Sequence, residues 1–186
     1  MFTAEQKAAL SAPLDKRHVS TRSQAGRSLS YVEGWHAIAE ANRIFGFDGW
    51  SSETVDIKLV AERERTIGQQ KRPGFGVSYI ARVRITVFAG DRIVVREGVG
   101  SGHGIDTDLG LAHESAIKEA ETDGRKRGLM MFGNQFGLAL YDKTQANVAD
   151  LGGMASERDA IEALTDPKPA QDTPAQERPR SPHTRG

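Results

Sequence analysis

The sequence contains no cysteine, few aromatic residues and no long apolar run. Without cysteine, the 186-residue chain forms neither disulfide bonds nor cysteine-based zinc sites, and a reducing cytosol suits it. No segment approaches the roughly 20 consecutive apolar residues of a membrane span, and the first residues lack the apolar block of a signal peptide. The five histidines lack paired metal-ligand spacing. We therefore expect a cytoplasmic protein with no membrane, metal or cofactor.

The chain also lacks an excess of either charge. Its 25 Lys and Arg residues balance 25 Asp and Glu residues, a formal net charge of zero that at first argues against a nucleic-acid binder. From residue 147 onward there are seven acidic and five basic side chains, a net charge of −2, so the preceding part carries +2. Any polyanion site must therefore be a focused basic stripe.

Proline marks a change of composition near the end of the sequence. Five of the seven prolines lie between Pro167 and Pro182, among polar residues. Such a segment buries too little apolar surface to offset its ordering entropy, so we predict a disordered tail at 166–186. Residues 147–165 are predicted to be a short helical extension, with a helix at 156–164 capped by Ser156. The main domain is then 1–146.

Hydrophobic periodicity predicts the elements of this domain. Residues 30–45 have apolar side chains at helical spacing, with Ser30 as the N-cap and Glu33 completing a capping box. Alternation then predicts strands at 55–60, at 77–87 and from 93 onward, with Gly90–Asp91 as the turn between the last two. A long polar loop is expected at 62–76.

A long helix is predicted from about 108 to 131. Small residues recur in it at every fourth position, namely Ala112, Ala116, Ala120, Gly124 and Gly128. Such a stripe lets a helix lie close to a sheet, which explains better than a hinge why two glycines are tolerated at about 1 kcal/mol each. The predicted fold class is α+β, a β-β-β-α core in which the long helix crosses an antiparallel meander, preceded by an N-terminal helix.

Two groups of residues resemble catalytic sites but lack the required spacing. The glycine run at 98–104 has no Gly-Lys-Ser/Thr ending and follows an antiparallel meander, so we interpret it as a flexible turn rather than a phosphate loop. A metal-dependent nuclease site is not supported by the spacing of Glu97, Asp106, Asp108, Glu114, His103 and His113. Asp106 and Asp108 are better explained as helix-capping residues.

Three adjacent cations, Arg125, Lys126 and Arg127, interrupt the apolar helical run. At a spacing of four residues, Arg125 can pair with Glu121 and Arg127 with Asp123. Lys126 has Thr122 at that spacing, so its charge stays available. Arg127 can still direct its guanidinium outward. The pattern favours a polyanion lying along this helix.

Arg82 and Arg84 form a second basic pair. They lie two residues apart on a predicted strand and therefore share the face opposite Val83 and Ile85. An ordinary solvated face and a groove for phosphates are both open interpretations.

Six segments of the chain form a recognisable series. They are SYVEGWH at 30–36, NRIFGFDGW at 42–50, EGVGSG at 97–102, KEAETDGRKR at 118–127, FGN at 132–134 and DK at 142–143. In this order they resemble the N-terminal domain of the Rad52/Rad22 single-strand annealing proteins. The resemblance covers about 14–143. The length and missing C-terminal domain are similar to those of a bacterial or phage-encoded member, which implies a nucleoid-associated location in the cytoplasm.

The resemblance implies a ring in which single-stranded DNA lies in a groove, backbone inward and bases outward. It implies DNA contacts by Arg22, Tyr31, Lys126 and Arg127. This chain departs from the family's pattern at Met130, where members can carry a basic residue, and near Thr107, where a lysine of an outer site would fall. Further candidate DNA contacts are Arg27, Lys71, Arg72, Arg82 and Arg84.

The resulting hypothesis is a non-enzymatic protein that anneals complementary strands without ATP in recombination and repair. Its expected partners are single-stranded DNA, copies of itself in a homo-oligomeric ring and, through the C-terminal tail, a single-strand-binding protein or recombinase. The alternative is a single-stranded-DNA-binding mediator that loads a recombinase through its tail.

Overall fold

The computed structural model describes residues 1–24 and 26–152, without the side chains of Gln24 and Arg27. The predicted helix at 156–164 and the predicted tail at 166–186 lie outside these residues. In the described part, no helix combines the length and apolar character needed to cross a membrane.

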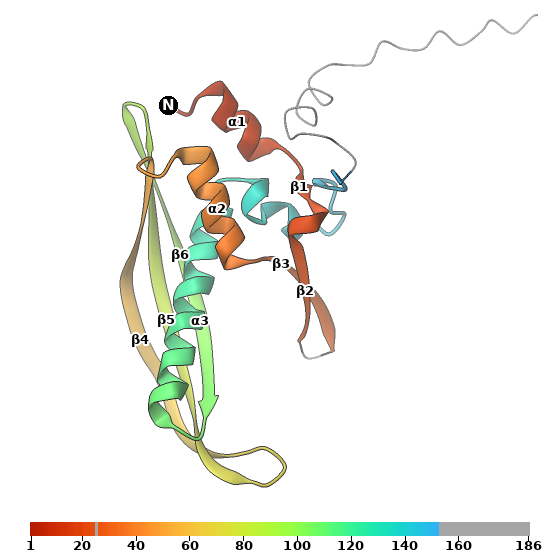
Figure 1. The fold of residues 1–186 in the computed structure, drawn as a ribbon. Coiled ribbons are helices and arrows are strands. Elements are labelled where there is room, and N and C mark those ends of the chain that lie inside the picture. The colour runs from red at the N-terminus through yellow and green to blue at the C-terminus, as the bar shows by residue number, and fades with distance from the viewer. Residues whose placement is uncertain (25, 153–186) are drawn as a thin grey trace, which may run out of the picture. The chain divides into compact units, whose positions relative to one another are not determined.

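A three-stranded antiparallel sheet forms one side of the described fold (Figure 1). Its strands are β4 (Trp50–Ile67), β5 (Arg72–Ala89) and β6 (Arg92–Asp106), in that order. The alternation predicted for the middle strand is confirmed, since Val77, Ala81, Val83, Ile85 and Val87 are all buried. The predicted turn at Gly90–Asp91 joins β5 to β6, and Gly90 has a φ of +64° that favours glycine there.

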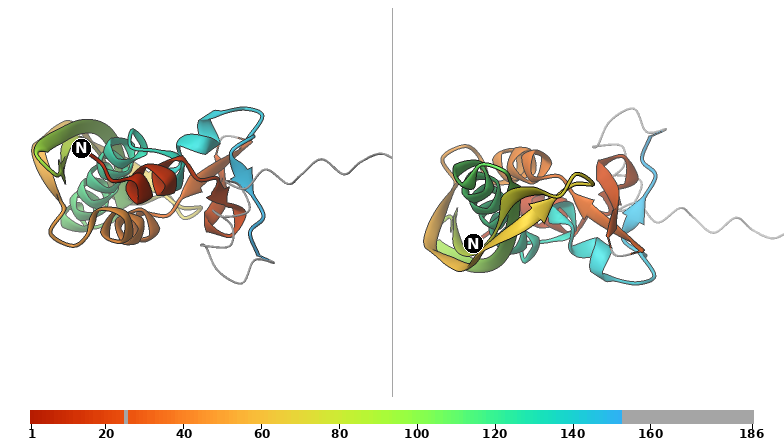
Figure 2. Two further views of the ribbon diagram at one scale, coloured as in Figure 1. Left: turned by 90° about the horizontal axis from the view of Figure 1, so that it is seen from above. Right: turned by 90° about the horizontal axis from the view of Figure 1, so that it is seen from below.

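Helix α3 (Leu109–Met130) lies lengthwise on one face of this sheet. In the end-on views of Figure 2, the curved sheet partly surrounds it. The predicted stripe of small residues is buried along the contact. The capping interpretation is confirmed, because the Asp108 carboxylate accepts a hydrogen bond from the Leu111 N–H at 2.9 Å and Asp106 accepts one from the Asp108 N–H at 3.0 Å.

The glycine-rich segment at 98–104 is part of strand β6, so the predicted flexible turn is wrong. A Cβ atom at Gly100 would lie 2.2 Å from the Gly124 nitrogen and 2.3 Å from the Ala120 oxygen. Added Cβ atoms at Gly98, Gly102 and Gly104 would meet the α3 backbone equally closely. Alternate glycines of the strand therefore meet the small residues of the helix, and the two backbones touch.

The free edge of β6 is covered by carboxylates from α3. The N–H groups of Ser101 and His103 donate hydrogen bonds to Asp123 at 3.3 Å and to Glu119 at 2.7 Å. These acids satisfy edge groups that would otherwise be open to pairing with another chain. These hydrogen bonds also fix the position of α3 along strand β6.

The predicted polar loop at 62–76 is also wrong, because β4 and β5 continue through most of it. Their pairing extends to Ile67 opposite Arg72, and only residues 68–71 form the turn. Almost every side chain from 62 to 71 is exposed. With little to bury on either face, this part of the hairpin has no apolar alternation from which a strand could be predicted.

The predicted helix at 30–45 begins later than expected. Helix α2 spans Gly34–Phe45, whereas Ser30 lies in strand β3 (Arg27–Val32), which pairs antiparallel with β2 (Val19–Gln24). The predicted capping box is therefore wrong: Ser30 is paired with Thr21, and the side chain of Glu33, which is the N-cap, makes no capping hydrogen bond. Cross-strand pairing holds this segment extended, which a local capping pattern cannot reveal.

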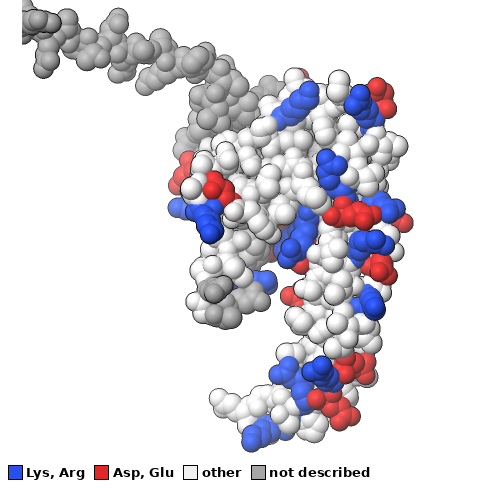
Figure 3. Space-filling model, turned by 180° about the vertical axis from the view of Figure 1, so that it is seen from behind, with Lys and Arg blue, Asp and Glu red and all other residues white. Residues whose placement is uncertain are grey.

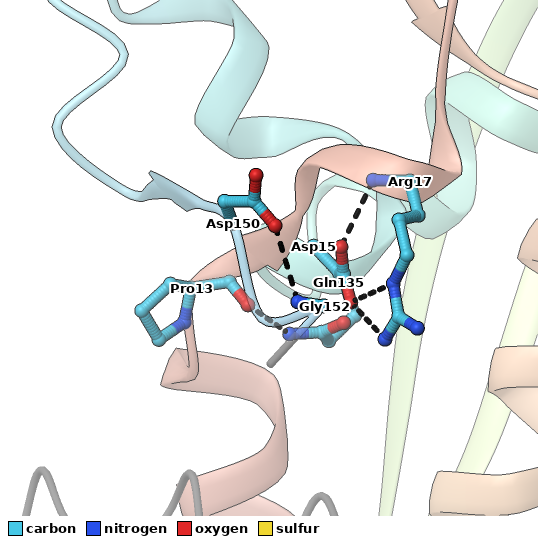
Figure 4. Close-up of polar contacts among 6 residues, drawn as sticks. All are labelled: Pro13, Asp15, Arg17, Gln135, Asp150 and Gly152. Atoms are coloured by element: carbon cyan, nitrogen blue, oxygen red, sulfur yellow. Dashed lines mark hydrogen bonds and ion pairs between the residues drawn. The ribbon is translucent and has the colours of Figure 1, made fainter. Parts of the chain in front are cut away.

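Several short elements beside the sheet were not predicted. They are α1 (Ala4–Ser11), β1 (Leu14–Asp15), β7 (Val148–Ala149) and the 3-10 helices η1 (Lys16–His18), η2 (Asn134–Phe136) and η3 (Leu138–Tyr141). Strands β1 and β7 pair in parallel. Figure 4 shows the Gln135 amide donating to the Pro13 carbonyl. It donates equally to the Ala12 carbonyl, both at 3.0 Å. These contacts join segments more than 120 residues apart.

An aromatic cluster joins α2 to the end of α3. The Phe45 ring packs edge-on against Phe132, with centroids 5.4 Å apart, and stacks on Phe136 at 5.9 Å. Leu129, in the last turn of α3, is fully buried beside them. The cluster fixes the last turns of α3 relative to α2.

His36, in the first turn of α2, is buried and stacked on His18. The two ring centroids are 4.0 Å apart, and the His36 Nε2 atom has no hydrogen-bond partner among the described residues. Burial, followed by the charge of His18, lowers the pKa of His36 below its usual value of 6.5. Below pH 6.5, the unfolded chain therefore binds more protons at this position than the folded chain does.

We expect the free energy of unfolding to fall as the pH is lowered from 7 through 6.5, and His36→Gln to flatten that dependence. Urea unfolding at a series of pH values would measure it. His103→Gln, at an exposed histidine, is the matched control. A pH profile that His36→Gln leaves unchanged would contradict the assignment.

We expect Gly100→Ala to lower the free energy of unfolding by about 1–3 kcal/mol, because its Cβ would separate β6 from α3. Denaturant unfolding followed by circular dichroism measures this. Ser101→Ala, at the next and exposed position of the same strand, should change stability by less than about 0.5 kcal/mol. Equal stability of the two variants would argue against the close contact.

Candidate nucleic-acid interface

An open hollow lies between the β2–β3 hairpin and the C-terminal half of α3. Its volume is about 510 Å³. The structure brings together here the four residues that the resemblance singles out, Arg22, Tyr31, Lys126 and Arg127, all of which line it. They come from both strands of the hairpin and from a helix almost 100 residues later.

The Tyr31 ring is the point where two cations meet. The Lys126 Nζ atom lies 5.3 Å and the Arg22 Cζ atom 5.7 Å from the ring centroid, both within cation–π range. Hairpin register explains one contact: Ser20 pairs with Tyr31 and Arg22 with Leu29, so Arg22 and Tyr31 are diagonal neighbours on one face. The ring thus holds two like charges close together. A hydrogen bond to Glu33 raises the pKa of the Tyr31 hydroxyl.

Arg127 is positioned by Asp123, one helical turn before it. The Arg127 Nε atom donates to the Asp123 carboxylate at 2.9 Å, which raises the pKa of the guanidinium. The same carboxylate accepts the Ser101 N–H of β6, so strand β6 indirectly orients Arg127. Because the contact uses Nε and the side chain is 50% exposed, the terminal amino groups are accessible to an anion.

Lys126 has no carboxylate partner among the described residues, as its spacing from Thr122 predicts. Its Tyr31 contact is electrostatic but does not neutralise it. The ammonium group therefore presents a full positive charge to the hollow.

Arg125 has a structural role, in agreement with the pairing predicted from the sequence. Its guanidinium donates to Glu121 at 3.2 Å and to the Ser52 hydroxyl of β4 at 3.1 Å. Glu121 also accepts the Thr54 hydroxyl at 2.6 Å. These bonds join α3 to β4, so Arg125, the first cation of the triplet, stabilises the fold.

Arg82 and Arg84 lie on the face of the sheet opposite α3. Arg84 pairs with Glu97 at 2.8 Å and with Glu53 at 3.7 Å, and Arg82 approaches Glu97 at 4.0 Å. In Figure 3, which shows the molecule from behind, basic and acidic side chains are interleaved along the limb that contains the sheet. These pairs favour the solvated face over the phosphate groove.

The remaining candidates lie elsewhere. Lys71 is in the turn between β4 and β5, and Arg72 begins β5, where its Nε atom donates to Gln70 at 3.0 Å. Neither lines the hollow at α3. Arg27 begins β3, and its side chain lies outside the described part of the structure.

No sequence pattern predicted the apolar and aromatic part of the hollow, which is formed by Leu29, Met130, Phe136, Leu140 and Tyr141. Tyr141 is 65% exposed. These residues come from the hairpin, α3 and the short 3-10 helices after it. No local periodicity marks them, because the left-handed turn at Gly137, with a φ of +94°, brings the last two into place. Cations beside apolar surface suit a ligand with both phosphates and flat apolar groups.

Comparison with known proteins gives relatives over most of the chain. Residues 3–152 match the family described as Rad52/22 family double-strand break repair protein. The DNA repair and recombination protein rti1 of Schizosaccharomyces pombe is 40% identical over 136 residues, covering 72% of this chain and 34% of that protein. RAD52 of Eremothecium gossypii is 41% identical, covering 72% and 30%. RAD52 of Saccharomyces cerevisiae is 39% identical, covering 70% and 27%. The chain thus matches about a third or less of these relatives' lengths.

We expect Arg125→Met to lower the free energy of unfolding by about 1–2 kcal/mol, through loss of its bonds to Glu121 and Ser52. Lys126→Met, the matched change one residue later, should alter it by less than about 0.5 kcal/mol. Urea denaturation of both variants checks this. Equal losses would show that Arg125 is no more structural than its neighbour.

Proposed function

This chain belongs to the Rad52/22 family of double-strand break repair proteins, and we propose that it binds single-stranded DNA and anneals complementary strands without ATP. The observation that carries the proposal is the gathering of Arg22 and Lys126 around Tyr31, with Arg127 beside them. Annealing makes and breaks no covalent bond, so the proposal includes no catalytic residue and no cofactor.

The chemistry of the hollow suits annealing. Lys and Arg side chains neutralise phosphates without occupying the base edges, which must stay free for a complementary strand to pair. Lys126 and Arg127 stand on a helix that is packed backbone to backbone against the sheet. A bound strand would therefore meet cations already held in position.

Assembly into a ring is part of the proposal. Each copy offers only a few cations, and the formal net charge of the chain is zero, so one copy would bind DNA weakly. Copies arranged in a ring would contact one strand together and raise the affinity through effective concentration. A homo-oligomer thus accounts for DNA binding by a protein without a basic excess.

A second DNA contact is proposed at the tip of the β4–β5 hairpin, at Lys71 and Arg72. They have no carboxylate partner among the described residues, whereas Arg82 and Arg84 are paired with acids. Arg27 is a further candidate because it begins the strand that carries Tyr31. Thr107 carries no charge, so an outer site in this chain would depend on other residues.

Two finer predictions from the sequence concern origin and partners. The relatives named above are fungal and give no support to the expected bacterial or phage origin or to a nucleoid-associated location in the cytoplasm. The tail at 166–186 is proposed to contact a single-strand-binding protein or recombinase.

An annealing assay tests the main proposal. Two complementary oligonucleotides, each coated with a single-strand-binding protein, are mixed with and without the protein, in the absence of ATP, and duplex formation is followed by fluorescence transfer. We expect the protein to accelerate pairing. DNA binding without acceleration would favour the recombinase-loading mediator instead, and magnesium-dependent loss of the strands would indicate a nuclease.

We expect Lys126→Ala combined with Arg127→Ala to weaken binding of single-stranded DNA more than about tenfold at physiological salt and to reduce the salt slope by about two. Fluorescence anisotropy at several salt concentrations measures both. Lys7→Ala with Lys118→Ala removes the same charge from exposed positions outside the hollow and serves as the control. Size-exclusion chromatography should show an unchanged oligomer. Wild-type affinity in the Lys126/Arg127 variant would refute the site.

A further inference from the structure

Trp35 is a large aromatic side chain that the interface described above does not use. It lies in the first turn of α2 and is 69% exposed. Single exposed apolar residues are common on protein surfaces, so exposure alone gives it no role. The reason to assign Trp35 a role comes from the residues that surround it.

A second hollow, of about 230 Å³, separates the start of α2 from α3. Trp35 and Ile38 line it from α2, and Thr122, Arg125 and Lys126 line it from α3. Lys126 lines this hollow and the larger one. The same lysine therefore borders both the hollow beside the indole and the hollow beside the Tyr31 ring.

The backbone around Trp35 is held closely against α3. A Cβ atom at Gly34 would lie 2.9 Å from the Thr122 methyl group, which places the start of α2 one helical turn before Lys126. The Trp35 ring packs edge-on against His36, with centroids 5.5 Å apart and planes at 80°. The indole is thus supported along one side while most of its surface faces solvent.

We propose that Trp35 is a stacking platform for a base of the single strand whose backbone is neutralised by Lys126, an inference that rests on the proposed function. An exposed indole beside two cations matches a nucleotide, which has a flat base and an anionic phosphate. Base–aromatic stacking is tolerant of sequence because every base has a π-face. It leaves the pairing edge of the base free, so it is compatible with annealing.

The charge of the hollow favours DNA over another copy of this chain as the occupant. Lys126 has no acidic partner among the described residues, and covering it with an apolar protein surface would desolvate an unpaired charge. A phosphate neutralises it instead. Phe47 is even more exposed, at 87%, but it follows the other end of α2, beside Asp48 and not beside Lys126. The two ends of α2 are about 17 Å apart along the helix axis.

Tryptophan fluorescence tests the proposal directly. The chain has two tryptophans, and Trp50 is half-buried with its indole N–H bonded to Asn42 at 2.8 Å. A labelled oligothymidylate is titrated into the full-length protein, with anisotropy reporting binding and indole emission reporting stacking. We expect emission to be quenched in step with binding, and most of the quenching to be lost in Trp35→Phe while binding persists.

Affinity measurements separate base contacts from phosphate contacts. We expect Trp35→Ala to weaken oligothymidylate binding by about 5- to 100-fold, Trp35→Phe to weaken it less and Phe47→Ala to leave it unchanged. With an abasic deoxyribose-phosphate strand, Trp35→Ala should have no effect, whereas Lys126→Ala should weaken binding of both strands. The salt slope should change only in Lys126→Ala.

Each result that contradicts these expectations leads to a definite conclusion. Wild-type affinity and quenching in the Trp35 variants would overturn the stacking role, as would an equal effect of Trp35→Ala on the abasic strand. A changed oligomer size for Trp35→Ala in sedimentation velocity would assign the indole to a contact between copies. If the wild-type protein binds no single-stranded DNA at all, the proposed function itself fails.

Discussion

The contact between the backbones of β6 and α3 is the constraint on which the described fold depends. A Cβ atom at Gly98 would lie 2.2 Å from the Gly124 oxygen and 2.3 Å from the Gly128 nitrogen, so neither element can move or rotate without a clash or a gap. Because Gly124 and Gly128 face the sheet, helical geometry directs Lys126, halfway between them, to the opposite side. The same packing that buries the stripe therefore directs Lys126 away from the sheet.

A chain with no net charge keeps its basic site through the placement of its acids. Arg125 and Arg127 each have a carboxylate four residues earlier, and both pairs form. The first serves the contact with β4, whereas the second orients a guanidinium that is still half-exposed. Lys126 has a threonine at that spacing and keeps its charge. The residues one helical turn earlier thus give the three adjacent cations different roles.

The accuracy of the sequence predictions follows the range of the interactions involved. The long helix, its Asp108 cap and the pairings of Arg125 and Arg127 were predicted correctly, because partners three or four residues apart decide them. The alternation of β5 was visible because one face is buried throughout. Three predictions were wrong because distant contacts decide the conformation. Pairing with β2 keeps residues 30–32 extended, and contact with α3 makes 98–104 part of a strand. Residues 62–76 belong to an exposed hairpin that shows no apolar alternation. Arg22 and Tyr31 were found through a family resemblance, not through any local pattern.

The sequence by itself determined the α+β class, the family, the buried stripe of α3 and the unpaired charge of Lys126. Each of these depends on a short repeat, a local spacing or a set of matching motifs. Only the tertiary structure decided that Arg22, Tyr31 and Lys126 meet at one ring, that the glycines of β6 form a strand, and that Trp35 stands beside the same lysine. The reason is physical: hairpin register and close helix–sheet packing bring together residues almost 100 positions apart, and no periodicity within either segment encodes that distance.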